Sequence, residues 1–103
     1  MALTTKVFYR GAAATSNTTL YTTASTETAV ITNILVTNTA GTSATYTINI
    51  DGIAAISGST IAANGVTAID LKQPLIATGS TKTITGSASA TTVNFHISGV
   101  EIA

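Results

Sequence analysis

Residues 28–51 read TAVITNILVTNTAGTSATYTINID, and this stretch decides the fold class. In its second half apolar and polar residues alternate, with Ala44, Tyr46, Ile48 and Ile50 between Thr45, Thr47, Asn49 and Asp51. A period of two places one set of side chains on a buried face and the other in water, as in a β-strand. Residues 44–51 are therefore predicted to form a half-buried strand.

The first half of the stretch is apolar on both faces: Val30, Ile34 and Val36 share one parity, and Ile31 and Leu35 share the other. Such a strand is central in its sheet, covered from both sides or in contact with a partner. The residues between the halves, 39–43, include Gly41, which can take the positive φ of a short hairpin loop. We therefore expect a hairpin of two long strands.

Short segments rich in β-branched and aromatic residues predict further strands at 6–10, 18–23, 53–57, 59–63, 66–71, 81–87 and 91–102. The dipeptides at 51–52 (Asp-Gly) and 64–65 (Asn-Gly) are strong hairpin signals. A further turn is expected at 58–59, so that 51–71 forms a meander, and another at 79–80. Pro74 is expected to break pairing because proline has no N–H to donate.

In the last segment, Val93, Phe95 and Ile97 alternate with polar residues, and the apolar set shifts by one position after Gly99. A β-bulge at Gly99 would return Val100 and Ile102 to the buried face. Helical periodicity is nearly absent, and the strand segments recur every 8–12 residues or so. The fold class predicted is all-β, an antiparallel β-sandwich or jelly roll of about eight short strands.

The chain has 103 residues, the size of one domain. We predict a single sandwich domain over 1–103, with an N-terminal arm at 1–10 whose first five residues are loose. Charged residues make up 8% of the chain, against about 25% in an ordinary soluble domain, and the formal net charge is zero. Without a basic field, nucleic-acid binding by phosphate attraction is not expected.

The longest apolar run is four residues, 53–56, whereas a membrane-spanning helix needs about 20. The first residues, MALTTKVFYRG, lack the apolar core of a secretory signal. We therefore expect no membrane association, and synthesis in the cytoplasm with a surface suited to the exterior. Because the chain contains no cysteine, it has no disulfides and no thiolate metal site.

Residues that could carry catalysis are few. The single histidine, His96, is expected to point outward from the last strand, and no nucleophile elbow accompanies it. The four acids are predicted to be scattered turn and surface residues: Glu27, Asp51, Asp70 and Glu101. No metal-ligand spacing and no phosphate-binding glycine loop occurs. We predict no enzyme activity, no catalytic residues, no metal and no cofactor.

Three of the five aromatic residues lie within the first 21 positions. Phe8 and Tyr9 are neighbours, so on a strand they face opposite ways, and one of them is available for contact outside the core. The candidate subunit or virion interface in this region is formed by Phe8, Tyr9, Arg10 and Tyr21, and the alternative is ordinary packing of these residues on their own domain.

Three segments, FYRGAAATSNTTLYT (8–22), ETAVITNILVTNTAGTSATYTINIDG (27–52) and NFHISGVEI (94–102), resemble small structural proteins of tailed-phage virions. These include capsid decoration (cement) proteins and tail- or fibre-associated β-sandwich domains. The resemblance implies a non-enzymatic virion component present in many copies, often as trimers. Its partners would be copies of itself and the major capsid protein or other virion subunits.

Two functions follow from these observations. The first is a capsid decoration protein that oligomerises and clamps neighbouring shell subunits. The alternative is a tail- or fibre-associated binding module that recognises a receptor or a glycan. A cluster of exposed aromatic residues would favour the alternative, because sugars stack on exposed rings.

Overall fold

The computed structural model describes residues 3–76 and 79–102. Eight strands account for most of them: β1 (Leu3–Ala12), β2 (Thr18–Thr22), β3 (Thr28–Asn38), β4 (Ala44–Ile50), β5 (Ile53–Ile61), β6 (Val66–Ile76), β7 (Thr83–Ala88) and β8 (Val93–Ile102). The described residues contain no helix, and hence none long and apolar enough to cross a membrane.

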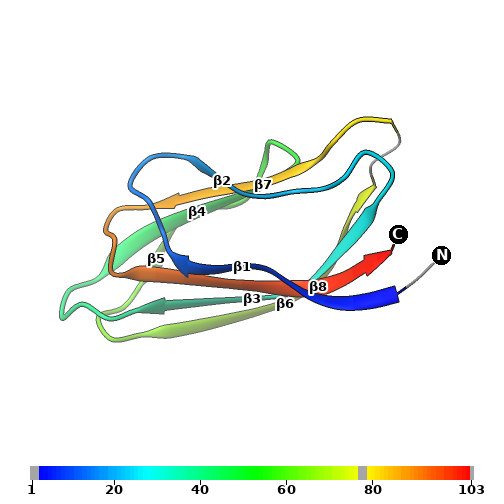
Figure 1. The fold of residues 1–103 in the computed structure, drawn as a ribbon. Coiled ribbons are helices and arrows are strands. Elements are labelled where there is room, and N and C mark those ends of the chain that lie inside the picture. The colour runs from blue at the N-terminus through cyan, green and yellow to red at the C-terminus, as the bar shows by residue number, and fades with distance from the viewer. Residues whose placement is uncertain (1–2, 77–78, 103) are drawn as a thin grey trace.

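The strands form two antiparallel four-stranded sheets that pack face to face (Figure 1). The first sheet has the order β1-β8-β3-β6 and the second the order β2-β7-β4-β5. The pairs are nested, since β1 pairs with β8, β2 with β7, β3 with β6 and β4 with β5. This is the strand order of a jelly roll, and the predicted fold class is confirmed.

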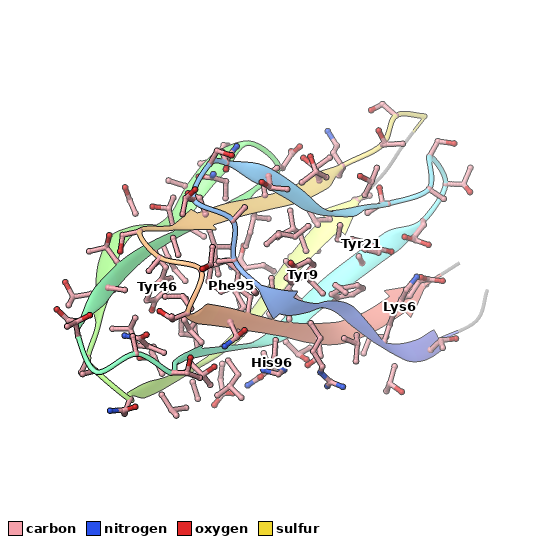
Figure 2. All side chains as sticks on the ribbon, turned by 60° about the vertical axis from the view of Figure 1, so that its left-hand side comes forward. Lys6, Tyr9, Tyr21, Tyr46, Phe95 and His96 are labelled. Atoms are coloured by element: carbon pink, nitrogen blue, oxygen red, sulfur yellow. The ribbon has the colours of Figure 1, made fainter. Side chains whose placement is uncertain are left out.

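The core lies between the sheets and consists of the inward residues of the long central strands. On β8, Val93, Phe95 and Ile97 are fully buried, and on β4 Tyr46 and Ile48 are buried, as the alternation predicts. The rings of Tyr46 and Phe95 meet edge-on across the two sheets, with centroids 6.2 Å apart (Figure 2). Each such residue stabilises the fold by about 1.5–3 kcal/mol through burial.

The mixed parity of β3 is explained by a β-bulge. Ile31 lies opposite Gly99 of β8 and Asn33 lies opposite Ser98, so Thr32 is an extra residue in β3. The bulge reverses the parity of the strand, so that Ile31, Ile34 and Val36 are all fully buried while Leu35 is half-buried on the outer face. The prediction that this strand is central is confirmed, because β3 lies between β8 and β6.

The predicted hairpins at 39–43 and 64–65 are wrong, because both connections cross between sheets. The loop at 39–43 leads from β3 to β4 in the other sheet, and Gly41 does not take a positive φ. The Asn-Gly turn at 64–65 leads from β5 to β6 in the opposite sheet. Among the described strands, only those joined by the Asp-Gly turn at 51–52 are both consecutive and paired. The φ values of 54° and 75° fit a type I′ turn, so the hairpin predicted there is confirmed.

Asn38 fixes the end of the sandwich where these crossings occur. Its side chain is 2% exposed, and its amide donates to the carbonyl oxygens of Thr42 and Ala62 at 2.8 and 3.3 Å. Its Oδ1 accepts from the N–H of Ala40 and from Thr92 Oγ1, each at 3.1 Å. One buried amide therefore joins three loops with its hydrogen-bonding capacity filled.

Two predicted breaks lie inside continuous strands. The expected turn at 58–59 is absent because Gly58, with φ of 58°, is accommodated within β5, whose pairing with β4 shifts register twice. The meander predicted for 51–71 is thus two long strands in different sheets. Pro74 does not end β6 but pairs in register with Val30, because β6 is an edge strand, where a missing N–H is tolerated.

The bulge predicted at Gly99 lies in the neighbouring strands instead. Strand β8 keeps its alternation through Gly99, which is buried, so Val100 and Ile102 are half-buried on the outer face. The extra residues are Thr32 in β3 and Phe8 in β1. A Cβ at Gly99 would collide with the carbonyl oxygen of Val30 and approach the ring of Phe8. Glycine is needed here because two bulged strands close over it.

The N-terminal arm predicted at 1–10 belongs to the first sheet. Residues from Leu3 onward pair with β8 as the edge strand β1, so the prediction of a loose segment is wrong for Leu3–Thr5. Met1 and Ala2, the remainder of that segment, lie outside the described residues.

We expect Gly99→Ala to lower the free energy of unfolding by about 1–3 kcal/mol, because the added methyl group meets backbone that cannot move without breaking the ladder. Gly41→Ala is the matched control, because nothing lies within 4 Å of a Cβ added at this position, and the φ of Gly41 suits alanine. Urea unfolding of both variants measures the difference. Equal effects would contradict the account of Gly99.

Candidate functional site

The outer face of the second sheet is covered by hydroxyl and amide groups. On β4 and β7 the residues that alternate with the buried set point outward, and those opposite them on β2 and β5 share that face. They are Thr19, Thr22, Thr45, Thr47, Asn49, Ala54, Thr60, Thr83, Thr85 and Ser87, all but one of them polar. This hydroxyl face carries no charge and binds water well.

The outer face of the first sheet is different, because many of its side chains are apolar. Its outward positions include Val7, Val30, Leu35, Val66, Ala68, Pro74, Ile76, Val100 and Ile102. Three of these are strongly exposed: Val66 at 66%, Ile76 at 54% and Val7 at 46%. We call this surface the apolar face. A concentration of exposed aliphatic side chains on one side of a small domain is typical of an interaction surface.

The apolar face carries few charged groups. Arg10 lies opposite His96 in the β1–β8 pair, and its Nε donates to His96 Nδ1 at 3.1 Å. The partner of the imidazole is a guanidinium, not a carboxylate that would orient it as a general base. His96 points out of the sandwich, as predicted (Figure 2). The other charged residues on this face are Asp70 and Lys72, on β6.

The bulges in β1 and β3 shape a shallow depression of about 430 Å³ on the first sheet. It is lined by Thr5, Lys6, Val7, Arg10, Thr32, Ser98 and Gly99. Two of these lining residues, Lys6 and Arg10, are cationic, and the others are uncharged.

The four residues predicted to form an interface do not lie on one surface. Phe8 is 5% exposed and packs in the core against Tyr21, with ring centroids 4.7 Å apart. Tyr9 is half-buried against the core, and its hydroxyl donates to the carbonyl oxygen of Ala12 at 2.8 Å. Of the four, Arg10 alone lies on the apolar face.

Lys6, Tyr21, Glu27 and Glu101 form a cluster that the sequence does not reveal. Lys6 Nζ lies 2.5 Å from Glu101 Oε2 and 3.4 Å from the hydroxyl of Tyr21. That hydroxyl donates to Glu27 Oε1 at 2.5 Å and lies 3.5 Å from Glu101 Oε2. The prediction that the acids are scattered surface residues is therefore wrong for Glu27, which is 8% exposed, and for Glu101.

The cluster changes the acidity of its members. The hydrogen bond from Lys6 holds the pKa of Glu101 below its usual value, and the same bond raises the pKa of Lys6. Burial, followed by the hydrogen bond to Glu27, raises the pKa of Tyr21 to about 12. Each polar group has its partner inside the cluster, which links β1, β2, β8 and the residue before β3. We interpret it as a structural tie between the two sheets.

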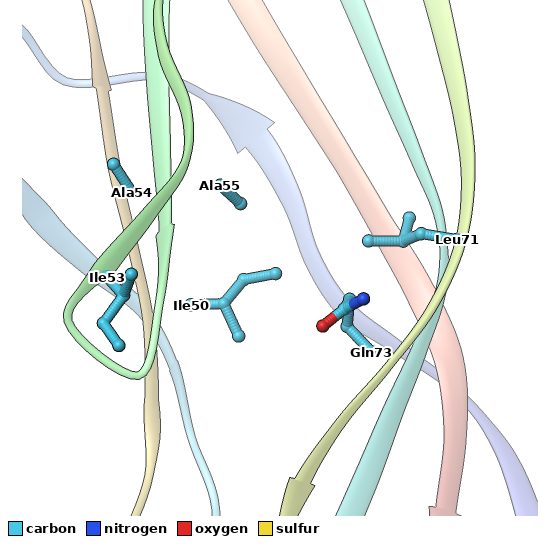
Figure 3. A pocket seen from close by; sticks show the side chains of 6 residues that line it. All are labelled: Ile50, Ile53, Ala54, Ala55, Leu71 and Gln73. Atoms are coloured by element: carbon cyan, nitrogen blue, oxygen red, sulfur yellow. The ribbon is translucent and has the colours of Figure 1, made fainter.

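A pocket of about 460 Å³ opens between the β5 and β6 edges of the sandwich (Figure 3). It is lined by Ile50, Ile53, Ala54, Ala55, Leu71 and Gln73. The lining contains no charged group, and Ile53 is 73% exposed. The two sheets are not closed by side chains along this edge, so apolar surface is left in contact with water.

No group of three or more metal-binding side chains occurs within residues 3–76 and 79–102. Comparison with protein-family models finds no family that matches the chain, and comparison with curated proteins finds no relative. The surfaces of the molecule are therefore the basis for assigning a function.

Tyr21→Phe is expected to lower the free energy of unfolding by about 1–3 kcal/mol, because the buried carboxylate of Glu27 loses its hydroxyl donor. Tyr9→Phe is the control, since it removes a hydroxyl that donates to a carbonyl at the surface, and should cost about 1 kcal/mol or less. Chemical denaturation of both variants tests this order, and the reverse order would contradict the structural role of the cluster.

The Lys6–Glu101 pair should contribute stability only over a limited pH range. Because folding lowers the pKa of Glu101 from its ordinary value of 4.5, this carboxylate adds to the free energy of unfolding above pH 4.5. The contribution is lost as pH falls through the lowered pKa. Because folding raises the pKa of Lys6 from 10.5, this ammonium group adds to the free energy of unfolding below pH 10.5. The contribution is lost as pH rises through the raised pKa. The difference in unfolding free energy between the natural chain and Lys6→Met should be largest between these limits.

Lys72→Met, measured at protein concentrations low enough to keep the chain monomeric, is the control for this pH series, because Lys72 forms no ion pair within the chain among the residues that the structure describes. Its effect on stability should not vary over the same range. A Lys6→Met effect that is constant from acid to alkaline pH would contradict the pairing.

Proposed function

We propose that this chain is a non-enzymatic structural protein of a tailed-phage virion, a capsid decoration protein that binds the assembled shell in many copies and stabilises it. The observation that carries the proposal is the contrast between the two outer faces of the sandwich. A hydroxyl face suits contact with water, and an apolar face on the opposite side suits contact with protein. The sequence resemblance to small virion proteins supplies the virion context.

The composition of the apolar face favours binding to another protein surface. Burying a charge is costly, whereas aliphatic side chains gain free energy when they leave water. The outward row across the middle of the sheet runs Arg10–His96–Leu35–Ala68, so the charge of this row lies at its β1 end. The other charged groups of the face, Asp70 and Lys72, lie on the opposite edge strand, β6. The centres of protein interfaces are likewise depleted in charged residues. A shell subunit seated on this face would desolvate few charged groups.

The surface gives less support to a tail- or fibre-associated module that binds a glycan. All five aromatic residues lie within the described ranges, and each is buried or half-buried. A receptor-binding site that used aliphatic contacts would occupy the same apolar face. The two functions therefore differ in the partner and its position on the particle.

Purified particles of the phage that encodes this chain provide the first test. We expect mass spectrometry to find the chain in these particles in many copies, and its absence would refute the proposal. Particles that lack the chain should then bind the purified protein saturably and resist heat better with it bound. Binding to host cells or glycans instead of shells would support the alternative.

Matched variants locate the binding face. Leu35→Asp places a charge at the centre of the apolar face and should weaken shell binding by about tenfold or more. Thr45→Asp makes the same addition on the hydroxyl face, on a central strand of the other sheet, and should leave binding within about twofold. Equal loss of binding by both variants would contradict the assignment of the apolar face.

A further inference from the structure

Strand β6 is the longest of the four edge strands. Strand β1 is interrupted by the bulge at Phe8, β2 has five residues and a register shift, and the pairing of β5 shifts twice. Strand β6 has eleven residues, and its pairing with β3 shifts once, where Leu71 and Lys72 lie opposite Thr32. All its even-numbered side chains, from Val66 to Ile76, nevertheless remain exposed on the apolar face. An unpaired edge of this length offers its backbone N–H and C=O groups to another strand.

Exposed apolar surface is concentrated at the same edge. Among the residues whose exposure is described, the strongly exposed large hydrophobic ones are Ile53, Val66 and Ile76, on β5 and β6, and Val7, on the opposite edge of the first sheet. The pocket between β5 and β6 adds Ile50 and Leu71. The open backbone and the uncovered side chains thus occur together.

The charges on β6 select a self-complementary register. When identical strands pair antiparallel, residues directly opposite each other share a face, so the even-numbered residues must meet one another. Pairing centred on Leu71 places Asp70 opposite Lys72 of the second copy, and does so twice because the interface is two-fold symmetric. Centring on Asp70 or on Lys72 would place identical charges opposite each other.

The same register matches the apolar residues. Val66 lies opposite Ile76 of the second copy, so the two strongly exposed large hydrophobic side chains of the strand cover each other at both ends. Ala68 lies opposite Pro74, and the two copies of Leu71 meet at the axis, beside the open pocket. Pro74 removes one donor from each strand, so the pairing rests on the central section, residues 69–73, which includes the two residues that lie opposite Thr32 of β3.

We infer that two copies of this chain associate along β6, antiparallel and centred on Leu71, to form a continuous eight-stranded sheet. The association joins the apolar faces of both copies into one surface and leaves the hydroxyl faces free. This inference concerns self-association alone and does not rest on the virion role.

Sedimentation velocity of the purified chain over a range of concentrations tests the stoichiometry. We expect a reversible monomer–dimer equilibrium, and hydrogen exchange should show the backbone N–H groups of β6 more protected at high than at low concentration. A chain that stays monomeric, forms trimers, or dimerises without added protection in β6 would overturn the inference. These measurements use the natural sequence and depend on no variant.

Charge reversal tests the register. Asp70→Lys and Lys72→Asp each replace two opposite-charge contacts with like-charge contacts, so each should raise the dissociation constant about tenfold or more. The double variant, with both substitutions, restores complementarity and should return the constant to within about threefold of the natural value. If the single variants have no effect, or the double variant binds no better than either, the Leu71-centred register is refuted.

Val66→Thr combined with Ile76→Thr tests the apolar contacts while keeping β-branched residues in the strand, and should weaken the dimer about tenfold. Val7→Thr is the matched control on the opposite edge of the same sheet and should change the constant by less than about twofold. Circular dichroism during thermal unfolding verifies that each variant is folded. An equal loss from Val7→Thr would place the interface elsewhere.

Discussion

The extra residue in β3 is the constraint on which the rest of the first sheet depends. Without the bulge at Thr32, Ile31 would lie on the opposite face from Ile34 and Val36, and the strand could not fill one core. The bulge brings the Val30 carbonyl oxygen so close to β8 that only glycine fits at position 99. Phe8 is the extra residue of β1 on the other side of β8, and its ring covers the same position. Two bulges and one glycine therefore set which residues enter the core.

Local pattern predicts the strands well but not their partners. The alternation in 44–51 and 91–98 identifies the buried faces of β4 and β8 correctly, and the Asp-Gly dipeptide identifies the one hairpin that joins paired strands. The loops at 39–43 and 64–65 have similar turn chemistry, yet they cross between sheets, because distant packing and the buried Asn38 decide their course. The candidate interface at Phe8, Tyr9 and Tyr21 was predicted from aromatic residues that the core uses instead, and a jelly roll brings Lys6 to Glu101 only through tertiary structure.

A surface with so few charges divides its roles between the two sheets. Threonine, serine and asparagine keep one side hydrated through neutral hydrogen bonds. The charged side chains are in pairs or clusters, or lie on the edge strands β1 and β6. The opposite side presents valine, leucine and isoleucine at positions where a monomeric protein usually has lysine or glutamate. This arrangement gives up the charge repulsion that keeps soluble proteins apart. It is consistent with the assembly that we propose for this chain.

The nested pairing of the strands also determines the order in which the chain can fold. Strands β4 and β5 are joined by a two-residue turn and can pair as soon as both have been synthesised, whereas β1 must wait for β8, the last strand of the described chain. Each successive pair closes a longer loop, and the entropy of that closure is lost before the contacts form. Topologies dominated by such distant contacts fold slowly, over milliseconds to seconds. During this interval the edge strand β1 has no partner, and a nascent chain at high local concentration is exposed to pairing with its neighbours.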